Sequence, residues 1–224
     1  MVAGCITVTG LASRLIGAIV SISETIPYPM LGLFIALVLT MFCCIILGMG
    51  VPTTANYCIM ASTCAPILIQ LGIPRVAAHF FVFYFGIVAD ITPPVALAAY
   101  AGSAIARSDP MKTGVNATKL AIAAFIVPYM FCLNPSMLLM NNGVLMAIQS
   151  VITSLIGLFG VSMGLEGYLS GKIKTPFRIL AAAAGLLLIY PGTISDLIGI
   201  IGVGLVIVLN VLSARSAKNA KPAV

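Results

Sequence analysis

Long uncharged stretches dominate the pattern of this chain. No Asp, Glu, Lys or Arg occurs in residues 25–74 or 120–165, and shorter uncharged stretches cover 91–106, 179–195 and 197–214. A helix that crosses the hydrocarbon core of a bilayer needs about 20 predominantly apolar residues. The pattern therefore predicts an all-α integral membrane protein with several spanning helices.

Two interruptions divide the apolar runs in the first half of the chain. The run over 30–47 ends at the uncharged connector Gly-Met-Gly-Val-Pro-Thr-Thr, residues 48–54, and a second run covers 55–71. These runs are either two short spans joined by a tight turn or a re-entrant helical hairpin. The hairpin is favoured because the connector has no charge to hold it in water, so we expect its tip to lie inside the membrane.

The second interruption is Ile-Thr-Pro-Pro at residues 91–94. It separates an aromatic-rich segment that ends at Asp90 from a small-residue segment at 95–106. Two successive prolines remove two N–H donors and disfavour helical geometry in the residue before them. Each half has about 15 residues, which is too short to span a bilayer. We therefore expect one broken transmembrane helix.

Composition and charge narrow the function classes. Hydrophobic residues make up 61% of the 224 residues and charged residues only 7%, against about 25% charged in an ordinary soluble domain. This excludes a soluble enzyme, a disordered protein and a nucleic-acid binder. The net charge of +6 is better explained by loops that face the cytoplasm. With the C-terminal tail inside, nine of the eleven Lys and Arg lie in the cytoplasm, Arg14 and Arg75 being the exceptions. If residues 76–106 formed two spans instead of one, the predicted membrane orientation of all residues before 76 would be reversed.

The two interruptions carry the candidate chemistry. Unwound backbone at membrane depth offers carbonyl oxygens to a cation and helix N-termini to an anion, and paired interruptions indicate a transporter binding site. Candidate cation-binding residues are Gly48, Gly50, Thr53, Thr54, Asp90, Thr92 and Pro93, with Thr54 and Thr92 as hydroxyl ligands of a Na⁺ ion. Candidate substrate-binding residues are Pro52, Thr53 and Pro94.

Each of these assignments has a structural alternative. Glycine and proline occur routinely in membrane helices, so the interruptions could serve packing alone. Asp90 either takes part in function, as acids within spans do, or caps the second half-helix. A channel would show polar or charged rings along its spans, and these spans are nearly bare of them. No catalytic triad, phosphate-binding loop or metal-ligand spacing is present, so we expect no enzyme and no cofactor.

Other unusual residues are expected to serve packing. We expect His79 and the aromatic residues of 80–85 to pack between helices or against lipid. The six cysteines form no Cys-x-x-Cys pair and are interpreted as small buried hydrophobic residues. Three glycines predict close helix contact: Gly199, Gly202 and Gly204.

Three segments resemble a known family. Residues 47–55 (LGMGVPTTA), 78–86 (AHFFVFYFG) and 91–100 (ITPPVALAAY) resemble the large membrane subunit of TRAP transporters, and most closely the fused permease of the TAXI type. The match covers about residues 1–135, and residues 136–212 resemble the extra C-terminal spans of the same permeases.

The resemblance implies an elevator-type fold built from two inverted repeats, each with a re-entrant hairpin and a broken helix. It implies that the hairpin and the broken helix here belong to the second repeat. Such permeases lie in the bacterial inner membrane and import organic acids that a periplasmic substrate-binding protein delivers. The coupling ion would be Na⁺, or H⁺ in the TAXI branch.

The chain departs from the family in lacking the first repeat and the small membrane subunit. It therefore resembles the C-terminal half of a permease, with the missing half, the small subunit and the lipid bilayer as expected partners. The alternative is a truncated, non-transporting remnant or interaction subunit. The expected segments are an end of a span plus an interfacial amphipathic helix (1–28), the re-entrant hairpin (29–74), the broken helix (75–107), a basic loop and span (108–135), C-terminal spans (136–214) and a cytoplasmic tail (215–224).

Overall fold

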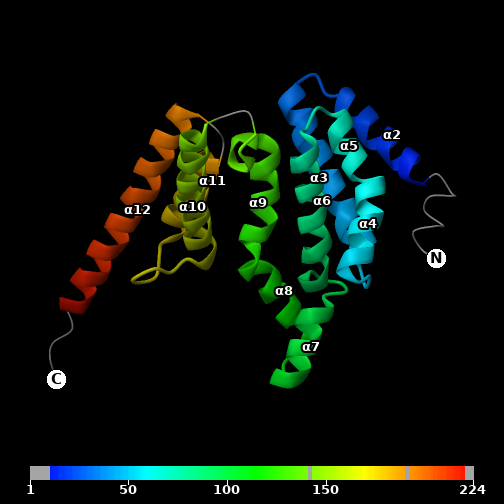
Figure 1. The fold of residues 1–224 in the computed structure, drawn as a ribbon. Coiled ribbons are helices and arrows are strands. Elements are labelled where there is room, and N and C mark those ends of the chain that lie inside the picture. The colour runs from blue at the N-terminus through cyan, green and yellow to red at the C-terminus, as the bar shows by residue number, and fades with distance from the viewer. Residues whose placement is uncertain (1–10, 141–142, 190–191, 220–224) are drawn as a thin grey trace. The chain divides into compact units, whose positions relative to one another are not determined.

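The fold is all-helical over the part of the chain that the structure describes. The computed structural model describes residues 11–140, 143–189 and 192–219, which form helices joined by short connectors (Figure 1). Within those ranges there is no β-strand, only an isolated bridge between Tyr168 and Lys172. The predicted fold class is thereby confirmed. The chain divides into two compact units, residues 1–132 and 133–224.

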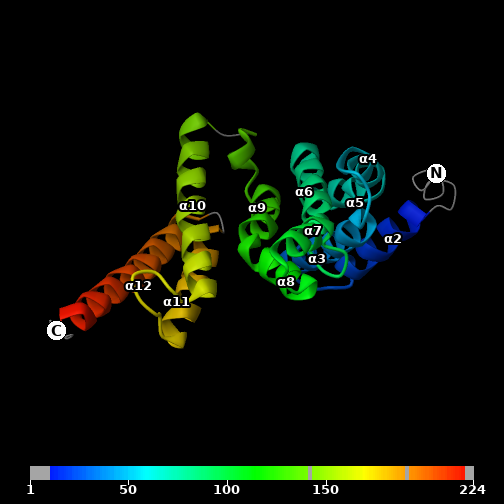
Figure 2. The same cartoon turned by 90° about the horizontal axis from the view of Figure 1, so that it is seen from below.

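The first unit contains a helical hairpin and an interrupted helix. Its helices are α2 (Leu11–Glu24), α3 (Pro29–Gly48), α4 (Thr53–Thr63), α5 (Ala65–Gln70), α6 (Arg75–Val88), the 3-10 turn η1 (Ala89–Ile91), α7 (Leu97–Ala106), α8 (Pro110–Leu120) and α9 (Ile122–Leu133). The chain runs along α3, turns, and returns along α4 and α5. The following helix, α6, packs against both α3 and α4, and the three run side by side in Figures 1 and 2.

Aromatic side chains of α6 form the centre of this unit. Phe81 and Phe85 are completely buried. Their ring centroids lie 5.3 and 5.8 Å from the ring centroid of Tyr129 on α9. Phe80 and Phe83 point outward, with 40% and 37% of their surface exposed. The aromatic run therefore serves packing on one face of α6 and presents an apolar surface on the other.

His79 and the cysteines also have structural environments. The Tyr57 hydroxyl lies 3.1 Å from Nδ1 of His79. This contact joins α4 to α6 and agrees with the packing role expected for His79. Cys44, Cys64 and Cys132 are buried, in agreement with their interpretation, and Cys43 is partly buried. Cys58 is exposed, so that interpretation is wrong for it. Its position on the outer face of α4 could not be read from an apolar run.

The second unit is a bundle of three helices preceded by a short turn. These are η2 (Pro135–Leu138), α10 (Val144–Glu166), α11 (Thr175–Ile189) and α12 (Thr193–Asn219). Glycines bring the helices together: a Cβ built on Gly157 of α10 would lie 2.7 Å from the carbonyl oxygen of Gly185 on α11. Gly199 and Gly202 likewise face α11, as predicted. Gly204 faces open space, so the prediction of a close contact there is wrong.

Several helices are long and apolar enough to cross a membrane. Among the described residues these are α3, α10 and residues 194–213 of α12. The pair α8 and α9, bent by 41°, qualifies as a fourth span if taken together. With 15 residues, α11 is shorter than the about 20 residues that a helix needs to cross a bilayer. These helices, with the composition, make the chain an integral membrane protein.

The structure adds detail within three of the expected segments. The expected basic loop before residue 120 contains helix α8, which starts because Asp109 accepts a hydrogen bond from the Lys112 backbone N–H at 2.8 Å and Pro110 follows it. The second arm of the hairpin is divided at Cys64, since Pro66 cannot donate to the preceding turn. The expected tail is helical as far as Asn219. The expectation for residues 1–10 lies outside the described residues.

Candidate functional site

The tip of the hairpin is a four-residue connector between α3 and α4. Gly50 has φ +71°, a left-handed conformation that glycine adopts without steric cost. Pro52 precedes α4 and no side chain caps this helix. The first backbone hydrogen bond of α4 runs from the Asn56 N–H to the Pro52 carbonyl at 2.9 Å. The N–H groups of Thr53, Thr54 and Ala55 therefore have no acceptor within the helix.

The interruption after α6 is longer and is held by neighbouring side chains. After η1, Thr92 is extended, the Pro93–Pro94 bond is cis, and Ala96 is left-handed before α7 begins. The Thr118 hydroxyl of α8 donates to the Ile91 carbonyl at 3.2 Å. The Tyr100 hydroxyl of α7 donates to the Pro94 carbonyl at 2.7 Å. The irregular backbone is therefore fixed by specific hydrogen bonds.

The tip and the interruption meet. A Cβ built on Gly48, the last residue of α3, would lie 3.0 Å from the Cβ of Ala89 in η1 and 2.8 Å from Nδ2 of Asn56. Gly86 of α6 is equally close, because a Cβ there would lie 3.1 Å from the same Nδ2. Two glycines thus allow α3, α4 and the end of α6 to approach without side chains between them. We call Gly48, Asn56, Met60, Gly86 and Ala89 the tip seam.

Asn56 is the functional candidate that sequence reasoning missed. It is only 1% exposed, and its Nδ2 donates to the Gly86 carbonyl at 3.0 Å. Its Oδ1 is buried and has no hydrogen-bond partner among the described residues. A buried amide oxygen without a partner is costly, by about 1–3 kcal/mol, and calls for a ligand, water or ion. The signal was an amide near the start of the apolar run 55–71, whose other amide, Gln70, lies at its far end.

The predicted site residues fall into two groups. Gly48 is buried in the tip seam, and Asp90 and Thr92 are partly buried beside it. Gly50, Pro52, Thr53, Thr54 and Pro94 are exposed, and Pro93 is partly buried. The Thr92 hydroxyl donates to the Val88 carbonyl at 2.7 Å, so its proton is used while its lone pairs stay available.

The alternative role of Asp90 as a cap is wrong. The residue before α7 is Ala96, which makes no side-chain hydrogen bond, and Asp90 belongs to the 3-10 turn that ends α6. Five residues, 91–95, lie between Asp90 and Ala96, the position that a cap would occupy. Asp90 therefore has no role at the start of α7. Among the described residues, no group of three His, Cys, Asp or Glu could hold a metal ion.

Taken together, the fold and this site define a class: a multi-helix membrane protein in which a hairpin tip meets an interrupted helix, as in secondary transporters. A family model described as "Tripartite ATP-independent periplasmic transporter, DctM component" matches residues 1–146. The match covers more than half of the chain, and the chain belongs to this family of TRAP transporter membrane components. Searches of curated proteins and of solved structures found no match. The family prediction is confirmed, and the TAXI type and the C-terminal half stay predictions.

Proposed function

We propose that this chain is a permease component of a TRAP-type symporter that imports organic acids with a cation gradient. A periplasmic substrate-binding protein delivers the acid, and the family membership supports that partner. The chain acts in the bacterial inner membrane as the C-terminal half of a TAXI-type permease. It works together with a first repeat and a small membrane subunit.

The coupling cation binds between the hairpin tip and the interrupted helix. The observation that carries this proposal is the buried Oδ1 of Asn56, which lacks a partner within the described structure. The further oxygen ligands in this proposal are backbone carbonyls near Gly48 and Gly50, the Thr92 hydroxyl and the Asp90 carboxylate. Uncharged hard oxygens suit Na⁺, while Asp90 is the group that would carry a proton in the alternative, H⁺-coupled mechanism.

The substrate carboxylate binds at the start of α4. Its first-turn N–H groups lack acceptors within the helix, and a helix N-terminus attracts negative charge. Pro52 and Thr53 form this exposed edge, and Pro94 lies in the exposed part of the other interruption. Thr53 and Thr54 can add hydroxyl donors. The cation would bind behind this edge, so a bound cation would also attract the anionic substrate.

The experiment measures whether Na⁺ stabilises the purified full chain. A ligand that binds only the folded state stabilises it by about 2.7 kcal/mol at 100 times its Kd. We expect the unfolding midpoint in detergent to rise with NaCl but not with choline chloride at the same ionic strength. Asn56→Leu keeps the side-chain size and removes the amide, so the Na⁺-dependent rise should disappear.

The matched control is Thr63→Val in the same helix. Thr63 is 2% exposed and its hydroxyl donates to the Ile59 carbonyl at 2.8 Å, so this variant removes a buried polar group away from the tip seam. It should keep the Na⁺ response of the wild type. An equal response in Asn56→Leu would contradict the site. A wild-type chain with no cation response would favour the non-transporting remnant.

Hydroxyl ligands can be tested in the same way. Losing one ligand to a buried ion should cost about 1–3 kcal/mol. That corresponds to a roughly 5- to 150-fold weaker apparent Na⁺ affinity. Thr92→Val and Thr54→Val keep the side-chain shape and remove the oxygen. Unchanged Na⁺ dependence in both variants would remove the threonines from the site.

A further inference from the structure

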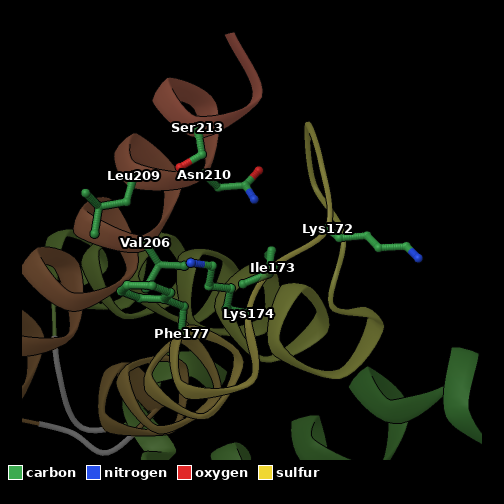
Figure 3. A pocket seen from close by; sticks show the side chains of 8 residues that line it. All are labelled: Lys172, Ile173, Lys174, Phe177, Val206, Leu209, Asn210 and Ser213. Atoms are coloured by element: carbon green, nitrogen blue, oxygen red, sulfur yellow. The ribbon is translucent and has the colours of Figure 1, made fainter. Parts of the chain in front are cut away.

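The second unit contains a small cavity at one end of its bundle. The cavity has a volume of about 150 Å³ and lies between the loop after α10, the start of α11 and the last turns of α12 (Figure 3). Phe177, Val206 and Leu209 line its apolar side. Lys174, Asn210 and Ser213 are among its polar lining. The cavity is therefore amphipathic.

The loop that forms this cavity is fixed to α12. Asn210 is 7% exposed, and its Oδ1 accepts a hydrogen bond from the Ser170 N–H at 3.1 Å. Its Nδ2 donates to the Gly171 carbonyl at 3.2 Å. Ile173, 8% exposed, anchors the same loop in the bundle core against Val206. The cavity is thus built by specific contacts and not by a loose loop.

The two lysines of the loop differ in direction. Both Lys172 and Lys174 line the cavity. In Figure 3 the Lys174 side chain extends over the cavity toward α12, whereas the end of the Lys172 side chain extends away from it. Both residues are exposed, and no acidic residue lines the cavity. Lys174 therefore brings a positive charge to the apolar lining, and no lining residue offsets it.

The cavity lies at the depth of lipid headgroups. The apolar window of α12 that is long enough to span a membrane runs from Ile194 to Ser213, and Ser213 lines the cavity. The apolar span of α10 ends at Glu166, just before the loop. Residues beyond the hydrocarbon core meet the phosphate region of the bilayer. The loop and α12 thus meet where lipid phosphates are found.

We propose that this cavity binds one anionic phospholipid, with its phosphate on Lys174 and the Ser213 hydroxyl. The upper part of an acyl chain lies along Phe177, Val206 and Leu209. Lysine binds phosphate as a point charge, and basic pockets beside membrane helices select anionic headgroups. The lipid fixes the C-terminal bundle at the cytoplasmic face, to which the positive charge of this loop assigns it.

The test is lipid binding to the purified full chain in a neutral detergent, followed by native mass spectrometry. The probes are phosphatidylglycerol, phosphatidylcholine with the same acyl chains, and inorganic phosphate. We expect the first bound phosphatidylglycerol to saturate and to bind more tightly than phosphatidylcholine. Lys174→Gln should weaken the affinity for phosphatidylglycerol about fivefold, because one lysine near anionic lipid contributes about 1 kcal/mol to binding.

The matched control is Lys172→Gln, which removes the same charge from the same loop. Lys172 also lines the cavity, but the charged end of its side chain extends away from it (Figure 3). This variant should change the affinity less than twofold, with folding of both variants checked by circular dichroism. Equal weakening in the two variants would show diffuse surface attraction and overturn the proposal. No preference for phosphatidylglycerol, or full competition by inorganic phosphate, would also overturn it, the latter because the cavity would then bind free phosphate.

Discussion

Replacing Gly48 by alanine tests whether the hairpin tip packs against the interrupted helix. The added methyl would lie 3.0 Å from the Cβ of Ala89, which cannot move without moving the backbone of η1. It would also lie 2.8 Å from Nδ2 of Asn56, whose alternative positions are limited by Gly86 on the other side. The tip must therefore separate from the interruption, or Asn56 must release the Gly86 carbonyl.

The magnitude follows from these contacts. Overpacking a close contact costs about 1–3 kcal/mol. Alanine recovers up to about 1 kcal/mol of helix propensity relative to glycine. The net destabilisation of Gly48→Ala is therefore about 1–2 kcal/mol. For a chain of this size, about 2–4 °C per kcal/mol gives a fall of roughly 2–8 °C in the unfolding midpoint.

The assay uses the buried cysteines as reporters. Cys44 and Cys64 have 0% exposure, so a thiol-reactive fluorescent dye labels them only after the first unit opens. Cys58 is exposed and contributes a constant background. The matched control is Gly102→Ala, because a Cβ at Gly102 has nothing within 4 Å. Gly102→Ala should raise the midpoint by a few degrees.

Gly48→Ala and Gly102→Ala must shift the unfolding midpoint in opposite directions. If Gly48→Ala raises the midpoint as Gly102→Ala does, then the tip does not contact η1 and the reasoning is refuted. If Gly48→Ala lowers the unfolding midpoint and also weakens its response to Na⁺, then the tip seam both packs the hairpin tip against η1 and binds the cation.

Further predictions address the charge, the topology and the second unit. Asp90→Asn should weaken the apparent Na⁺ affinity at least tenfold because it removes a negative charge, and it should change the stability without Na⁺ little because Asp90 caps no helix. A lower stability with unchanged Na⁺ affinity would show a structural role instead. In a background without reactive cysteines, Gly143→Cys should be labelled from the periplasm and Lys174→Cys from the cytoplasm, and labelling of both from one side would overturn the topology. Gly185→Ala should destabilise the chain by about 1–3 kcal/mol, since a Cβ there would lie 2.5 Å from a carbonyl oxygen of α10. The control Gly204→Ala should not destabilise it, because a Cβ at Gly204 has nothing within 4 Å. Equal thermal unfolding midpoints in the two variants would contradict the close packing of α10 and α11.

The sequence was most informative where backbone chemistry is restrictive. The connector at 48–54 and the Pro-Pro pair both end helices for local reasons, namely a left-handed glycine and missing N–H donors, and the structure places interruptions at both. Helix α8 was missed because its lysines suggested a loop, although Asp109 followed by Pro110 is a local signal for a helix start.

The partners of the site could not be predicted in the same way. The approach of Gly48 to Ala89 joins residues 41 positions apart and depends on how α6 packs between α3 and α4. Asn56 belongs to an apolar run in which one amide looked unremarkable, and only its burial without a partner for Oδ1 marks it. Asp90 fits a helix cap by residue type, but the length of the irregular segment excludes that role.

Equilibrium binding of ²²Na⁺ to the purified full chain tests the central claim most directly. The account predicts saturable binding of one ion per chain that unlabelled Na⁺ displaces and choline does not. Asn56→Leu should abolish this binding, and Thr63→Val should preserve it, because only Asn56 presents a buried oxygen without a partner at the tip seam. Absence of saturable binding in the wild type, or binding that survives Asn56→Leu unchanged, would contradict a cation site between the hairpin tip and the interrupted helix.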